Sequence, residues 1–200
     1  MSLHPPHRRR SMQTLADICR GSDILLDVDI SDKRQLFEYA ARQLGQRHAL
    51  NAPALQAALQ QREETGSTAL GHGLALPHAR IAGLADVRAL FLGLKRGLDF
   101  DALDGEPVHS LLVLLLPRDT RVPHLQLLAE IARVFGERPF RAELAACRLP
   151  GQVDSLFQRW SDPEPSNDPH FMLDSNRYFL DAEASLRPDY SVRRKVTARF

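Results

Sequence analysis

The chain has 200 residues, of which 44% are hydrophobic and 26% are charged. This length allows one ordinary domain with an appendage and is too short for two full-sized domains. Its 26 Lys and Arg residues against 25 Asp and Glu give a formal net charge of +1, so no global field attracts nucleic acid or an anionic membrane.

The sequence shows no sign of membrane insertion or secretion. The longest apolar run, residues 111–116, is far shorter than the roughly 20 residues that span a bilayer. The N-terminus is basic and has no apolar run behind it, so it is not a secretory signal. Cys19 and Cys147 form neither a CxxC pair nor a disulfide framework. We therefore expect a cytoplasmic protein.

The first elements are predicted from local patterns. Residues 1–12 are predicted to be a disordered basic tail, followed by an amphipathic stretch over 12–19. Residues 23–28 suit a strand at a sheet edge.

Two helices follow. Ser31 is the predicted N-cap of the first, whose apolar pattern weakens at Gly45, so the helix either stops there or runs on a few residues. Asn51 opens the second helix, which ends between Arg62 and Glu64.

The segment that follows the second helix is rich in glycine. Residues 65–73 hold three glycines and three hydroxylated residues, which is incompatible with a regular helix. Strands are predicted at 74–76, 87–94 and 108–116, and the last of these is apolar enough to be buried on both faces.

The remaining pattern is helical. Pro123 suits the first position of a helix with an apolar face formed by Leu125, Leu128, Ile131, Ala132 and Phe135. Two shorter helices are predicted at 138–147 and 152–160. Interleaved strands and helices predict one layered α/β domain over residues 13–161.

After Trp160 the composition changes. Residues 162–186 hold six acidic side chains and one basic one, and residues 187–200 hold five basic and one acidic. This extension, 162–200, is too short for its own core, so we expect it to be flexible. The alternative is that it folds back on the active face and regulates it.

The glycine-rich segment carries the chemistry. His78 follows a proline at the end of an apolar run, a context that leaves little slack in its position. Backbone amides around Gly71 and Gly73 are candidates for an anion nest, and Ser67 and Thr68 add hydroxyl donors. Taken alone, such a histidine is more often structural.

Two further residues fit an anion site. His124 lies just inside a predicted helix N-terminus, where free N–H groups and the helix dipole favour an anion. Arg62 offers a planar fork for phosphate oxygens. Each, taken singly, reads as a surface residue.

A longer pattern joins these residues. It consists of Glu63, six residues, Leu70-Gly71, two residues and Leu74-Ala75-Leu76-Pro77-His78-Ala79. It resembles the phosphorylation-site motif of enzyme IIA proteins of the mannitol/fructose/nitrogen type, from the bacterial phosphoenolpyruvate-dependent phosphotransferase system. Arg62 before the motif and His124 after it extend the resemblance, which covers residues 13–161.

The resemblance implies a three-layer α/β/α fold with a central mixed sheet. It also implies that His78 accepts a phosphoryl group on its Nε2 atom (tele-phosphohistidine), assisted by His124 and Arg62, with no cofactor. The donor is then an HPr-like or NPr-like phosphocarrier, and the protein a monomer or weak dimer. The sequence itself lacks the Walker lysine motif, which argues against direct use of a nucleoside triphosphate.

The sequence distinguishes less clearly between the nitrogen-regulatory and the sugar-specific branches of this system. The chain has no membrane segment and its extension is too short for a IIB domain, which favours a solitary nitrogen-regulatory IIA protein. In that subgroup the phosphorylation state controls downstream regulatory or transport partners. The alternatives are a sugar-specific IIA that passes phosphate to a separate IIB, and an interaction module that is not phosphorylated. Leu70, Leu74 and Leu76 are candidates for a docking rim, although at least half of them are expected to be core residues instead.

Other chemistries are disfavoured. His72, His78, His109 and His124 suggest zinc, but they lack an HExxH pattern and carboxylate-rich companions, so we expect no metal site. A serine hydrolase is excluded by the absence of GxSxG.

Overall fold

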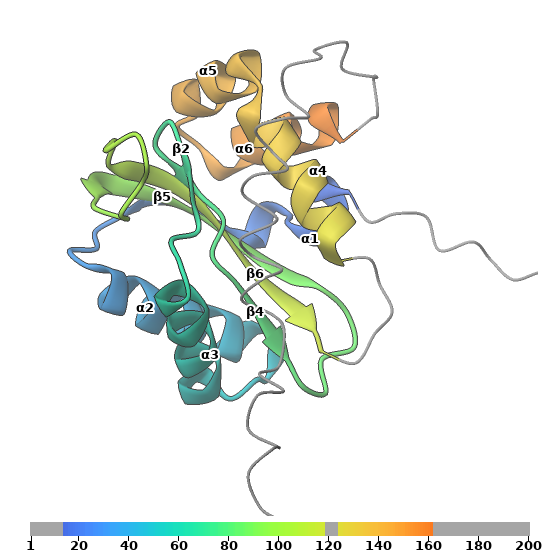
Figure 1. Cartoon of the computed structure of the whole chain (residues 1–200). Coiled ribbons are helices and arrows are strands. Elements are labelled where there is room, and N and C mark those ends of the chain that lie inside the picture. The colour runs from blue at the N-terminus through green and yellow to red at the C-terminus, as the bar shows by residue number, and fades with distance from the viewer. Residues whose placement is uncertain (1–13, 119–123, 162–200) are drawn as a thin grey trace, which may run out of the picture.

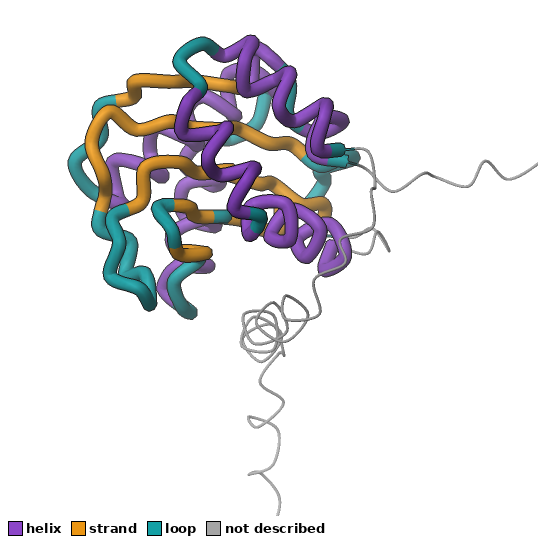
Figure 2. Tube along the Cα trace, turned by 90° about the horizontal axis from the view of Figure 1, so that it is seen from above, coloured by secondary structure: helices purple, strands orange, loops and turns teal. Residues whose placement is uncertain are grey.

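The computed structural model describes residues 14–118 and 124–161. Six strands form one mixed sheet with helices on both of its faces (Figures 1 and 2), which confirms the expected three-layer α/β/α fold. The predicted basic tail, the extension 162–200 and Pro123 lie outside the described residues. No helix within the described ranges combines the length and hydrophobicity that crossing a bilayer requires.

The elements occur in the following order: α1 Leu15–Ile18, η1 Gly21–Asp23, β1 Ile24–Val28, α2 Lys33–His48, α3 Ala52–Glu64, β2 Ala69–Gly71, β3 Leu74–Ala75, β4 His78–Ile81, β5 Arg88–Leu98, β6 Val108–Pro117, α4 His124–Gly136, α5 Arg138–Ala146 and α6 Pro150–Trp160.

The sheet is built around β6. The strand order is β1-β5-β6-β3-β2, and β4 pairs with β6 further along the side that β3 also uses. β5 is antiparallel to β6, whereas β3 and β4 are parallel to it. The predicted edge strand is confirmed as β1, and the strands predicted at 87–94 and 108–116 are β5 and β6.

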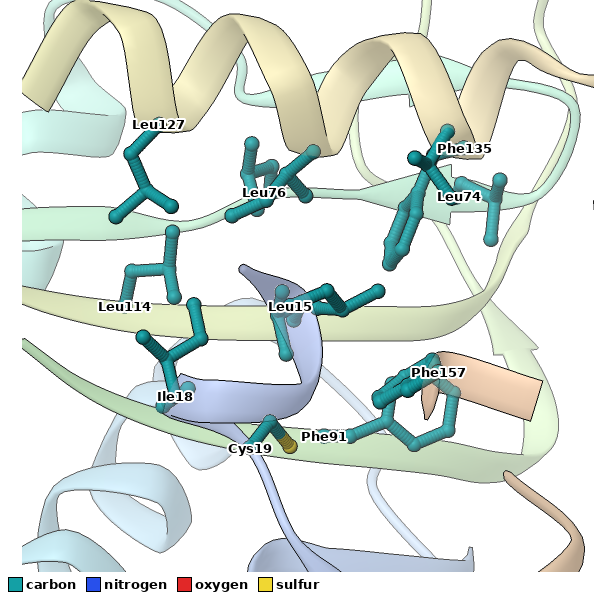
Figure 3. Packing of buried hydrophobic residues seen from close by; sticks show 14 of the residues in the cluster. Leu15, Ile18, Cys19, Leu74, Leu76, Phe91, Leu114, Leu127, Phe135 and Phe157 are labelled. Atoms are coloured by element: carbon teal, nitrogen blue, oxygen red, sulfur yellow. The ribbon is translucent and has the colours of Figure 1, made fainter. Parts of the chain in front are cut away.

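Two hydrophobic clusters lie on opposite faces of the sheet. One packs beneath α1, α4, α5 and α6 and includes Leu112 and Leu114; Figure 3 shows part of it. The other packs beneath α2 and α3 and includes Leu111 and Val113. Since successive side chains of a strand point to opposite faces, β6 contributes to both clusters and is buried on both sides, as predicted.

The helix ends differ in part from the sequence prediction. Asp32, not Ser31, is the N-cap of α2, because its carboxylate accepts a hydrogen bond from the backbone N–H of Gln35 at 2.7 Å. The helix runs past Gly45 to His48. The predicted cap at Asn51 is confirmed, since its side chain accepts from the backbone N–H of the residue three positions on.

One other expectation was wrong, and two strands were missed. Leu125 is 44% exposed and does not belong to the buried face of α4; Leu127 and Val134 lie there instead. The buried positions 127, 128, 131, 134 and 135 follow helical spacing, but in a phase that leaves Leu125 outside. β2 and β4 were not predicted, because both are short strands in the glycine-rich segment.

The first cluster offers a direct test of its packing. Phe157 is fully buried between Phe91, at 5.5 Å between ring centroids, and Phe140, at 6.2 Å. We expect Phe157→Ala to lower the free energy of unfolding by about 3–5 kcal/mol, measured by urea denaturation. Leu103→Ala, at a side chain that is 90% exposed, is the control and should change it by less than about 0.5 kcal/mol. Equal effects of the two substitutions would contradict this packing.

Candidate functional site

His78 is the first residue of β4 and lies at an edge of the sheet. β3 and β4 both pair with β6, but β2 pairs only with β3. The Leu76 N–H donates to the carbonyl of Thr68 at 2.9 Å, and beyond this bond the described chain places no strand beside β4. The half-buried His78 therefore lies where the edge of the sheet is open.

Two contacts define the state of the imidazole. Its Nδ1 atom lies 2.9 Å from the carbonyl oxygen of Leu76, and its Nε2 atom lies 3.2 Å from Nε of Arg62. A carbonyl only accepts hydrogen bonds and a guanidinium only donates them. The proton therefore sits on Nδ1, and the lone pair of the ring is on Nε2.

The surroundings keep this ring neutral. Burial lowers the pKa of His78 to about 4, assisted by the positive charges of Arg62 and Arg80 and opposed by the hydrogen bond to Leu76. At neutral pH the imidazole is therefore uncharged and Nε2 is a nucleophile.

Arg62 reaches this site from the last turn of α3. In addition to its contact with His78, its Nη1 atom donates to the carbonyl of Gly66 at 3.0 Å and to the hydroxyl of Thr65 at 3.3 Å. Within the described ranges, its Nη2 atom makes no hydrogen bond to the protein. A guanidinium held in this way has its Nη2 group available to an anion.

The predicted hydroxyl donors are used inside the protein. Ser67 donates to the carbonyl of Phe100 and accepts from the N–H of Ala69. Thr68 is buried and donates its hydroxyl proton to Glu63 at 2.6 Å. In this structure each hydroxyl already donates its only O–H hydrogen bond to another group of the protein.

The structure does not bring Gly71 and Gly73 to His78. Both glycines have positive φ, +81° and +75°, and they form the turn between β2 and β3. The carbonyl of Gly73 accepts from the N–H of His109, whereas His78 pairs with Leu114. Five residues of β6 separate these levels, which is roughly 16 Å at the rise of a strand. A phosphate-binding role for the two glycines stays a prediction and enters no proposal below.

The structure bears differently on His124 and on the predicted docking rim. His124 is the first residue of α4, but its side chain lies outside the described part of the structure. Leu74 and Leu76 are each 4% exposed and belong to the cluster beneath α4 (Figure 3). These two are core residues, the alternative that the sequence left open, and they do not form a docking rim. Leu70 is half-buried against the same cluster.

Of the histidines suggested for zinc, His72 and His109 lie at the turn between β2 and β3 and not beside His78. His72 lies in the distant turn, where it shares an exposed group with Asp104 and Glu106; their ligand atoms lie within 4.8 Å of one another. Exposed groups of this kind are common without a metal ion, and the group is separate from the site of His78.

One buried residue of the site was named in the motif without a role. Glu63 is 9% exposed and accepts hydrogen bonds from Thr68 and from Nζ of Lys33, the latter at 3.1 Å. The signal available in the sequence was an acidic residue next to Arg62 at the start of the motif. Its lysine partner lies 30 residues away, and no local pattern indicates that pairing.

Comparison with known proteins assigns the chain to a family. The family model described as "Phosphoenolpyruvate-dependent sugar phosphotransferase system, EIIA 2" matches residues 17–160. The chain belongs to this family, as its motif indicated.

Individual relatives indicate which type within the family the chain resembles. The "Nitrogen regulatory protein" of Bradyrhizobium diazoefficiens is 33% identical over 134 residues, which cover 67% of this chain and 88% of that protein. The "Nitrogen regulatory protein" of Pseudomonas aeruginosa is 36% identical over 148 residues, covering 74% and 94%. The crystal structure of Nitrogen Regulatory Protein IIA-Ntr from Neisseria meningitidis superposes with a TM-score of 0.68 at 32% identity, over 72% of this chain and 98% of that one. Within the family the chain is therefore of the nitrogen type.

The protonation state of His78 can be measured directly. In an NMR titration of the ¹⁵N-labelled histidines, we expect the His78 signal to titrate near pH 4, with the proton of the neutral form on Nδ1. Arg62→Met should raise this pKa, because removing a nearby positive charge stabilises the imidazolium. A midpoint near 6.5, or a proton on Nε2, would contradict the geometry described above.

Proposed function

We propose that Nε2 of His78 accepts a phosphoryl group from the phosphohistidine of an HPr-like or NPr-like phosphocarrier. The observation that carries this proposal is the hydrogen bond between Nδ1 and Leu76, because it leaves the Nε2 lone pair at the open sheet edge beside Arg62. The cytoplasmic location expected from the sequence belongs to the same proposal.

The transfer is a substitution at phosphorus between two imidazoles. The Nε2 lone pair forms a bond to phosphorus while the bond between phosphorus and the donor nitrogen breaks, and that electron pair returns to the donor ring. His78 loses no proton, because Nε2 carries none. The positive charge that its ring gains is stabilised by the Leu76 carbonyl through the Nδ1–H bond.

Arg62 changes partners during this step. Its Nε–H points at the Nε2 lone pair at 3.2 Å before transfer, and it must release that lone pair to the incoming phosphorus. The same guanidinium then donates to the phosphoryl oxygens, over which the charge of the loose transition state is spread. The Nη1 bond to Gly66 keeps the guanidinium close while this happens.

His124 is carried into the proposal by the family resemblance. It begins α4, where the free amides of the first turn and the helix dipole favour negative charge. Its proposed role is to assist the phosphoryl transfer to His78.

The names of the relatives support a regulatory role over a sugar-specific one. Both proteins described above are called nitrogen regulatory proteins, and the chain covers most of their length. We propose that the phosphorylation state of His78 controls binding to downstream regulatory or transport proteins. A phosphoryl group adds about two negative charges at the surface, which is enough to alter an interface.

Reconstitution tests the transfer. With phosphoenolpyruvate, enzyme I and the phosphocarrier, we expect an acid-labile, alkali-stable phosphate on the protein and no label on His78→Ala. Arg62→Ala should slow transfer by about 100-fold, the typical cost of losing a donor to transition-state charge. His124→Ala should also be slower.

The matched control is Arg96→Ala, an exposed arginine paired with Asp29, which should transfer at the normal rate. Label on His78→Ala would disprove the acceptor assignment. Equal rates in Arg62→Ala and Arg96→Ala would remove Arg62 from the mechanism, and the absence of label on the unaltered protein would favour an interaction module.

A further inference from the structure

We propose that Glu63 is a positioning residue that holds the guanidinium of Arg62 against His78. The placement concerns the resting protein, and only its kinetic consequence rests on the function proposed above.

The carboxylate of Glu63 is buried and fully engaged. Its Oε2 atom accepts from the hydroxyl of Thr68 at 2.6 Å and from the backbone N–H of Thr68 at 3.2 Å, and its Oε1 atom accepts from Nζ of Lys33 at 3.1 Å. A buried carboxylate is costly unless it is paired and hydrogen-bonded, so these bonds fix where it can lie.

Glu63 and Arg62 hold the same loop from opposite ends. Arg62 binds the carbonyl of Gly66 through Nη1, Glu63 binds Thr68, and the backbone N–H of Gly66 donates to the carbonyl of Glu63 at 3.1 Å. The end of α3 and residues 65–68 therefore form a closed set of hydrogen bonds. Within it, Arg62 is left with Nε directed at His78.

Lys33 connects this loop to the body of the domain. Its Nζ atom binds Asp101 at 2.7 Å as well as Glu63, and it lies 4.4 Å from the ring centroid of Phe100. The Phe100 carbonyl in turn accepts from Ser67, inside the same loop. The end of α3 is thus anchored to the first turn of α2 by the bond between Glu63 and Lys33, and the loop is anchored to the segment after β5 by the bond between Ser67 and Phe100. The exposed carboxylate of Asp101 binds Lys33 and forms neither of these two bonds.

Two roles for Glu63 predict opposite changes at His78. If Glu63 acted only as a nearby negative charge, removing that charge would destabilise the imidazolium and lower the pKa of His78. If Glu63 places Arg62, its removal lets the guanidinium withdraw from Nε2, and the pKa of His78 rises. The sign of the change separates placement from simple electrostatics.

The test compares Glu63→Gln with Asp101→Asn in the full-length chain. Each substitution removes one carboxylate that binds Lys33, but Asp101 is exposed, and its carboxylate binds Lys33 rather than the loop residues 65–68. We expect Glu63→Gln to raise the pKa of His78 in the NMR titration and to slow phosphoryl transfer about tenfold. Asp101→Asn should leave both unchanged.

Thr68→Val provides a second route if Glu63→Gln does not fold. It removes the 2.6 Å bond without changing any charge, and it should shift the pKa of His78 and the rate in the same directions. An unchanged or lowered pKa in the folded variants would overturn the proposal. A raised pKa with a normal transfer rate would instead support the placement by Glu63 and overturn the role of Arg62 in transfer.

Discussion

The hydrogen bond between the Leu76 carbonyl and Nδ1 of His78 is the constraint on which the site depends. An imidazole has two nitrogens, and in a neutral ring only one of them is nucleophilic. A backbone carbonyl two residues earlier makes that choice here, through a part of the chain that no side-chain substitution removes. The residue between them, Pro77, has a fixed φ, so the carbonyl and the ring are joined by an unusually stiff link.

The open sheet edge beside His78 has features that limit pairing with strands of other molecules. Unpaired strand edges invite association with other strands, and proteins limit this with short edge strands and charged side chains. β4 is four residues long and carries Arg80, an exposed arginine, two positions after His78. A larger partner can thus approach the imidazole, while little unpaired backbone is offered to a second sheet.

Much of the fold and the central residues of the site could be predicted from the sequence. The contacts between elements that are distant in the sequence could not. The apolar run of β6 and the cap at Asn51 were readable because both follow local rules. Gly71 and Gly73 were not, since positive φ suits an anion nest and a tight turn equally well, and only the pairing of β3 with β6 shows how far they lie from His78. The contact of Glu63 with Lys33 depends on how α2 and α3 pack, which no spacing along the chain reveals.

The position of β6 limits how the protein can signal. Because this strand supplies side chains to the clusters on both faces of the sheet, neither helical layer can separate without disrupting the other. A domain built in this way is poorly suited to regulation by local unfolding or by the movement of one helical layer away from the sheet. In the function proposed above, a partner would then recognise a local change on the outside of the domain, namely a gain of negative charge at one end of one short strand.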